Sequence, residues 1–196
     1  EQYINFLSET NIPMERLRFA LNTKLPEEIS VKESFFVNVK FHARFSATKR
    51  SYRFRILNAP IKSALRRNCV FHFSLPLDFE AMEKAWLSLR GKHDFTVFGK
   101  SDSDRKDMTC EIFDTSCYKN GDELVFFITA SSFLRGMVRL LIGTTIFVGQ
   151  EKLKPEELMD IVIKKDRSRV GFSAGPTGLS LIKIEYPHSK ICPSLK

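Results

Sequence analysis

Asn120-Gly121 separates two runs of alternating apolar and polar residues, 108–118 and 124–130. This dipeptide suits the tight turn of a β-hairpin, because both central residues of that turn take positive φ angles. We therefore predict two antiparallel strands that meet here. A chain with such a hairpin has to build an antiparallel sheet and bury one face of it.

Strand and helix patterns alternate around this hairpin. Residues 51–57 alternate as a strand, with Tyr52 facing away from Arg53 and Arg55, and 69–73 could add a short strand. Asp78 is a plausible N-cap for a helix that Gly91 ends, 133–148 is a strongly apolar helix, another follows Pro155, and 179–186 closes as a strand. The order β-α-β-β-α-β predicts an α+β fold, a ferredoxin-like domain with an antiparallel sheet.

The first forty residues form a shorter pattern. Residues 3–7 resemble a strand, Pro13 opens a short helix, and 29–39 is β-rich again. We interpret this as the trailing half of a second, similar α/β domain. The expected organisation is therefore a partial domain over 1–40 and a C-terminal domain over 41–196, with the junction near 41–46.

Positive charge is concentrated in one region. The formal net charge is +8, yet no acidic residue occurs between Glu33 and Asp78. Removing the nine basic residues of that stretch leaves 22 Lys and Arg against 23 Asp and Glu. Such a local excess favours contact with a polyanion, although a solvated basic face or a membrane-surface patch would look the same. The nine residues are Lys40, Arg44, Lys49, Arg50, Arg53, Arg55, Lys62, Arg66 and Arg67.

Aromatic and basic residues interleave within this region. The stretch FHARFSATKRSYRFRI, residues 41–56, combines cations that neutralise phosphate with rings that stack on exposed bases. An ordinary edge strand would look similar, with Tyr52 and Phe54 in the core. Spacing favours the core for Phe54 and leaves Tyr52 open.

The apolar helix carries two arginines, Arg135 and Arg139, four residues apart. We expect them on one face of the helix. A buried arginine keeps its charge and needs an anion beside it. That anion is either a carboxylate of the protein, such as Asp114 or Glu111, or a substrate phosphate.

Several other classes of site have no sequence support. The cysteines, Cys69, Cys110, Cys117 and Cys192, form no C-x-x-C pair, and the histidines lack ligand spacing. We expect reduced cysteines in a cytoplasmic protein, with neither a disulfide nor a zinc site. No apolar run is long enough to span a bilayer, so we expect no membrane association through a transmembrane helix.

Five segments together resemble the tRNA pseudouridine synthase A (TruA) family. They occur in the family's order and extend over nearly the whole chain; FHARFSA and the arginine helix are the most specific. The segments are LNTKLPEEI (21–29), FHARFSATKRSYRF (41–54), FLRGMVRLLIGT (133–144), VGQEKLKPEEL (148–158) and GLSLIKIEYP (178–187).

The resemblance implies an isomerase that converts uridine to pseudouridine in the anticodon arm of tRNA, usually as a homodimer and without cofactor or metal. It places Tyr52 against the target base, makes Arg139 the partner of an essential aspartate, and makes Leu179 an apolar wall of the pocket. Further RNA contacts are expected from the basic segment and from the start of the arginine helix. These residues are His42, Arg44, Lys49, Arg50, Arg53, Arg55 and Arg135.

One departure from the family pattern is serious. The family's aspartate lies in a G-R-T-D block that should precede Glu1, and no Arg-Thr-Asp occurs in the 196 residues. We therefore expect the chain as given to be catalytically inactive. Two alternatives stay open: a noncatalytic RNA-binding α+β module, or an inactive paralogue that associates with a complete subunit.

Overall fold

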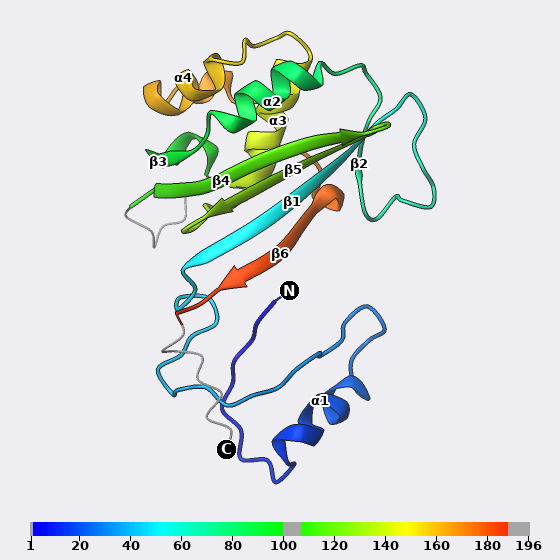
Figure 1. Cartoon of the computed structure of the whole chain (residues 1–196), viewed down its shortest axis with the longest axis vertical. Helices are drawn as coiled ribbons and strands as arrows, with labels where there is room; N and C mark the ends of the chain where they lie inside the picture. The colour runs from blue at the N-terminus through cyan, green and yellow to red at the C-terminus, as the bar shows by residue number, and fades with distance from the viewer. Residues whose placement is uncertain (1, 100–106, 188–196) are drawn as a thin grey trace. The chain divides into compact units, whose positions relative to one another are not determined.

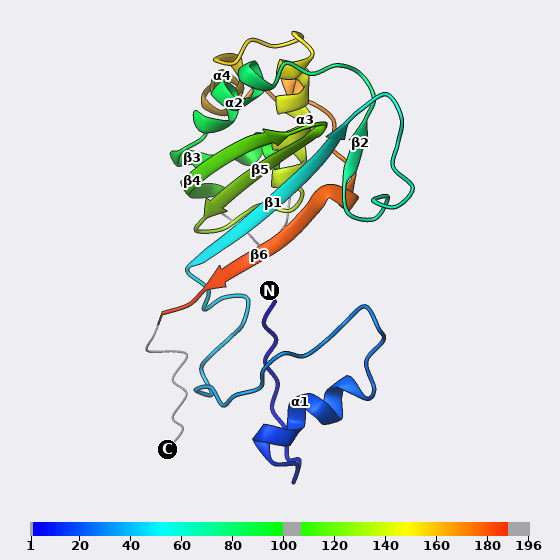
Figure 2. The ribbon, with the colours of Figure 1, turned by 45° about the vertical axis from the view of Figure 1, so that its right-hand side comes forward.

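The protein is described by a computed structural model that covers residues 2–99 and 107–187. The chain forms two compact units (Figures 1 and 2). The larger contains Lys49–Ile184, and the smaller contains Tyr3–Thr48 together with the segment that begins at Glu185. Within the described ranges, none of the helices is both long and apolar enough to cross a membrane.

The larger unit is built on one six-stranded sheet. The strand order is β2-β1-β5-β4-β3, and β6 also pairs with β1. The β1–β5, β4–β5 and β3–β4 pairs are antiparallel, whereas β1–β2 is parallel. The predicted α+β class is confirmed. The strands are β1 (Lys49–Asn58), β2 (Phe71–Phe73), β3 (Gly91–Asp94), β4 (Thr109–Asn120), β5 (Glu123–Ala130) and β6 (Leu179–Glu185).

The predicted hairpin joins β4 to β5. Asn120 pairs with Glu123, so Gly121 and Asp122 form the two-residue loop. Gly121 has a φ of +57°, the left-handed conformation for which glycine is suited. The hairpin prediction is confirmed, with the turn one residue later than Asn120-Gly121 itself.

Three helices cover one face of this sheet, as Figures 1 and 2 show: α2 (Phe79–Leu87), α3 (Met137–Gly149) and α4 (Glu157–Lys164). The fully buried Trp86 of α2 meets the ring of Phe126 on β5, with centroids 5.3 Å apart. Its indole N–H donates to the carbonyl of Phe127 at 2.9 Å, so the one polar group of this buried side chain has a hydrogen-bond partner. This core fixes the sheet against the helices.

Helix α2 begins as predicted and ends earlier. Asp78 is the N-cap, and its side chain accepts from the N–H of Ala81 at 3.1 Å. The helix ends at Leu87 with Ser88 as C-cap, so the expected end at Gly91 is wrong. Gly91 instead starts β3 with a φ of +116°, a conformation that an L side chain rarely adopts.

Helix α3 starts later than expected. Gly136 has a φ of +80°, and the helix begins at Met137 instead of Phe133. Arg135 is exposed and precedes the helix. The expectation that Arg135 and Arg139 share a helix face is therefore wrong, because the left-handed glycine redirects the chain between them.

The chain after α4 crosses α3 at very short range before it enters β6. The N–H of Gly171 donates to the hydroxyl of Thr144 at 2.9 Å. A Cβ on Gly143 would lie 2.8 Å from the carbonyl carbon of Phe172 and closer still to its oxygen. Two glycines, Gly143 and Gly171, thus allow this crossing. Short 3₁₀ turns complete the unit at η1 (Thr96–Phe98), η2 (Arg167–Arg169) and η3 (Pro176–Gly178).

The smaller unit contains one helix, α1 (Met14–Asn22), preceded by Pro13 as predicted. The strands expected at 3–7 and 29–39 are not formed in this described part of the chain. Those predictions are wrong, because a strand needs a neighbour for its backbone hydrogen bonds. The amide of Asn22 serves the backbone instead: it accepts from the N–H of Val31 at 2.7 Å and donates to its carbonyl at 2.9 Å.

Candidate active site and RNA-binding surface

Tyr52 lies on β1 and points to the helix-covered side of the sheet. Its ring meets Phe133 edge to face, with centroids 5.0 Å apart and planes at 87°. Partial burial raises the pKa of the Tyr52 phenol above its ordinary value, and the positive charge of Arg50 acts in the opposite direction. The phenol therefore stays protonated at neutral pH. The side chain offers an aromatic edge and a neutral hydroxyl.

Arg139 lies in the first turn of α3 and is half-buried. Its Nε donates to the carbonyl of Ala174, and the N–H of Ala174 donates to the carbonyl of Arg139 at 3.1 Å. These two bonds fix the guanidinium against the crossing segment. Among the described residues no carboxylate pairs with Arg139. The rest of the guanidinium can therefore bind an anion supplied from elsewhere.

Leu179 begins β6 directly after η3. It is partly buried and packs against the same hydrophobic cluster as Tyr52 and Phe133. Gly178 allows the chain to pass close to β1, because a Cβ there would lie 2.9 Å from the ring of Phe54. Tyr52, Arg139 and Leu179 thus come from three different elements of the larger unit. Within residues 2–99 and 107–187, no hydrogen bond joins Tyr52 to Arg139.

His42 and Arg44 lie in the smaller unit, in a compact turn over 41–46. Nδ1 of His42 accepts from the N–H groups of Arg44 and Phe45, at 3.1 and 3.3 Å. The N–H of His42 donates to the hydroxyl of Ser46 at 3.0 Å. The His42 ring is therefore used to shape the turn. The Arg44 guanidinium lies 5.5 Å from the centre of the exposed Phe45 ring, a pairing of cation and ring that suits an RNA base and its phosphate.

Lys49 and Arg50 open β1 in the larger unit. Lys49 places its ammonium 5.1 Å from the centre of the Phe113 ring. Arg50 donates to the carbonyl of Ser131 at 2.6 Å, which ties β1 to the end of β5. Since side chains alternate along a strand, Arg50 shares the face of Tyr52 and Lys49 lies on the other. The basic segment predicted from sequence is thus divided between two units and, on β1, between two faces of the sheet.

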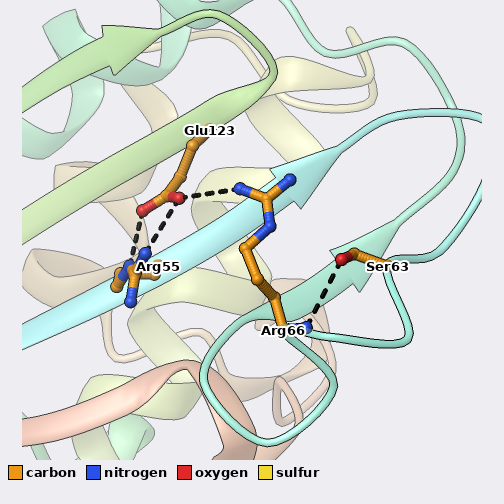
Figure 3. Close-up of polar contacts among 4 residues, drawn as sticks. All are labelled: Arg55, Ser63, Arg66 and Glu123. Carbon is orange, nitrogen blue, oxygen red and sulfur yellow. Dashed lines mark hydrogen bonds and ion pairs between the residues drawn. The ribbon is translucent and has the colours of Figure 1, made fainter.

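Arg55 is engaged by a carboxylate that the sequence analysis did not single out. Figure 3 shows Glu123 between Arg55 and Arg66: Oε2 accepts from Arg55 at 3.0 Å and from Arg66 at 3.2 Å, while Oε1 accepts from Nε of Arg55. The hydrogen bond from Arg55 is the main reason that the pKa of Glu123 lies below its ordinary value. The N–H of Arg66 donates to the Ser63 hydroxyl at 3.3 Å, so the cluster also fixes the loop before β2. No spacing in the sequence gives the β1–β5 register that brings Glu123 to Arg55.

The described residues offer neither a cluster of metal ligands nor, at Cys117, an ionised thiol. They include no group of three or more His, Cys, Asp or Glu side chains able to hold a metal. Burial, with the negative charge of nearby Glu83, raises the pKa of the Cys117 thiol to about 12, so it is not a thiolate at neutral pH. Cys192 lies outside the described residues.

Known proteins are similar to this sequence over most of its length. Residues 85–187, which include Arg139 and Leu179, match the profile of a family described as tRNA pseudouridine synthase. A protein named tRNA pseudouridine synthase A from Thermoanaerobacter sp. (strain X514) is 42% identical over 94% of this chain and 76% of its own. Proteins of the same name from Acetivibrio thermocellus and Caldicellulosiruptor bescii are 38% and 34% identical over the same shares.

The chain belongs to the tRNA pseudouridine synthase A family. The resemblance carried by the five sequence segments is confirmed. Of the family positions assigned from those segments, Tyr52 precedes the profile match, whereas the match includes Arg139 and Leu179. In the structure Tyr52 and Leu179 pack against the hydrophobic core of the larger unit, and Arg139 lies in the first turn of α3. The basic positions lie on β1, in the turn at 41–46 and before α3.

Proposed function

We propose that this protein is a tRNA pseudouridine synthase that isomerises uridine in the anticodon arm of tRNA, in the cytoplasm and as a homodimer. The observation that carries the proposal is the 42% identity with a tRNA pseudouridine synthase A over 94% of the chain. In this reaction the bond from ribose C1′ to N1 of uracil breaks and a bond from C1′ to C5 forms. C5 loses a proton and N1 gains one, so the reaction needs no redox cofactor.

Each site residue has a physical role in this proposal. Tyr52, held by Phe133 and neutral at working pH, lies against the target base. Arg139, held by Ala174, pairs with the catalytic carboxylate and keeps it ionised. Leu179 forms an apolar wall of the pocket, which excludes water from the detached base.

The catalytic carboxylate itself is not assigned to any residue of this sequence. None of the aspartates follows an Arg-Thr pair. We therefore propose that the 196-residue polypeptide alone does not catalyse the reaction. The same observation favours a second candidate function, RNA binding without catalysis, either as a module or as an inactive paralogue beside a complete subunit.

Tritium release from 5-³H-uridine in unmodified tRNA tests the assignment. The 196-residue chain should release none, and a chimera that adds the part of the Thermoanaerobacter relative outside the match should be active. In that chimera Tyr52→Ala should abolish release while tRNA affinity stays within about twofold, because the ring contacts one base among many phosphate contacts. Tritium release by the 196-residue chain would mean that one of its own carboxylates is the catalytic group. Near-normal turnover of Tyr52→Ala would make Tyr52 a core residue only.

Both candidate functions require tRNA binding, and a binding assay tests whether the basic segment supplies it. We expect the 196-residue chain to bind tRNA with an affinity that falls steeply with salt, because the contacts are electrostatic. Replacing Arg44, Lys49 and Arg50 by Gln together should weaken binding and flatten its salt dependence. Lys154→Gln, which removes an exposed lysine outside the basic segment, is the matched control. A chimera that binds tRNA but never releases tritium would favour the binding module.

A further inference from the structure

Strand β1 presents its functional side chains on opposite faces of the sheet. Tyr52 points to the helix side, where it meets Phe133, and Phe54 on the same side is 1% exposed. Arg53 lies between them in sequence and therefore points the other way, beside its register partner Phe127 on β5. Within the larger unit, the described helices α2, α3 and α4 lie on the first face, as Figures 1 and 2 show.

Arg53 is unlike its neighbour Arg55. Its Nε is screened from solvent and has no hydrogen-bond partner, and no ion pair links its guanidinium to any of the described residues. Two residues along the strand, Arg55 is held by Glu123 (Figure 3). A screened donor on a permanent cation is unfavourable unless something binds it. The structure therefore leaves Arg53 ready for an anion from outside the chain.

The surroundings of Arg53 suit RNA. Phe127 is partly exposed, and its ring lies 6.1 Å from that of the exposed Tyr118, with the planes only 31° apart. The hydroxyls of Ser51 and Thr129 lie on the same face, 2.8 Å apart. Flat rings, hydroxyls and an unpaired guanidinium on an open sheet are the groups with which proteins bind exposed bases and backbone phosphates.

We propose that the face of the sheet opposite α2, α3 and α4 is a second tRNA-contacting surface, on which Arg53 binds a backbone phosphate beside Phe127. This proposal rests on the proposed function. Tyr52 and Arg53 occupy opposite faces of one strand, so the phosphate belongs to a part of the tRNA remote from the target uridine. Arg55 does not share this role, because Glu123 neutralises it and the two hold the hairpin to β1.

Two RNA probes test this proposal on the 196-residue chain: a whole unmodified tRNA and the isolated anticodon-arm hairpin. Arg53→Gln should weaken binding of whole tRNA about tenfold and lower the slope of log affinity against log salt by about one, as expected for one lost phosphate contact. Hairpin binding should be unchanged. Arg53→Lys should restore part of the affinity. Lys154→Gln, an exposed lysine outside the proposed surface, is the control for affinity. Arg55→Gln, which removes the hydrogen bonds to Glu123, should lower the melting temperature.

Each other outcome has a distinct meaning. Failure of the unaltered chain to bind tRNA would remove the proposed function itself. Normal binding by a folded Arg53→Gln variant would remove only the second surface. An equal loss on the hairpin would place Arg53 beside the target, and so overturn the remote contact. If Arg53→Gln changed the protein from a dimer to a monomer in sedimentation velocity, a second copy of this chain, and not tRNA, would be the partner that covers this face.

Discussion

Gly143→Ala should destabilise the protein by disturbing the crossing that holds Arg139. A Cβ at this position would lie 2.8 Å from the carbonyl carbon of Phe172, and backbone cannot rotate away as a side chain can. The carbonyl oxygen of Phe172 is the nearest atom, so the crossing segment has to move by well over 1 Å. The overpacking cost therefore lies at the upper end of about 1–3 kcal/mol. Alanine gains about 1 kcal/mol in helix propensity. The net loss is about 2 kcal/mol, or a fall of roughly 4–8 °C in melting temperature for a chain of this size.

Two assays measure this effect. Differential scanning calorimetry gives the melting temperature, and hydrogen exchange follows the amides of Gly171 and Ala174, which donate to Thr144 and Arg139. Exchange at both amides should speed up by more than the fall in the free energy of unfolding alone would produce. Gly149→Ala in the same helix is the control, because its Cβ would meet the sulfur of Met82 at 2.6 Å.

That thioether can adjust, so Gly149→Ala should cost at most about 1 kcal/mol. Gly143→Ala with unchanged melting and unchanged amide exchange would refute the reasoning. It would mean that the segment after α4 is not held against α3, and that Arg139 is positioned by something else.

Two further predictions concern ion pairs. Glu123→Gln should lower the free energy of unfolding by about 1–2 kcal/mol in urea titrations, because Arg55 and Arg66 lose their half-buried carboxylate. An unchanged urea midpoint would show that the two ion pairs of Glu123 do not stabilise the fold. A hydrogen bond from Lys165, and next to it those from Thr96, lower the pKa of Asp94 to about 2. Asp94 therefore stabilises the folded protein at pH values above the ordinary pKa of 3.8 that the carboxyl has in the unfolded chain, and this stabilisation is lost as the pH falls through about 2. The pair is substantially exposed, so Asp94→Asn should cost about 1 kcal/mol at pH 7 and almost nothing near pH 2; an equal cost at both pH values would exclude the ion pair as its cause.

The sequence was informative wherever a local pattern is sufficient to determine structure. Alternation in β1, the Asn-Gly hairpin and the Asp78 cap were all predicted and are all present. Each depends on residues a few positions apart. Predictions failed where the outcome depends on neighbours. The β-rich stretches of the smaller unit pair with no strand among residues 2–99 and 107–187, and Gly136 delays the start of α3.

By itself, the sequence determined the family and the chemical identity of the candidate groups: the segments around Tyr52, Arg139 and Leu179 identify a pseudouridine synthase, because those motifs are local in the chain. The tertiary structure alone decided which groups are engaged. It paired Arg55 with Glu123, bound Arg139 to the carbonyl of Ala174 and left Arg53 without a partner among the described residues. The physical reason is strand register and helix crossing. These bring together residues that are far apart in the chain, and no pattern in a single sequence encodes that pairing.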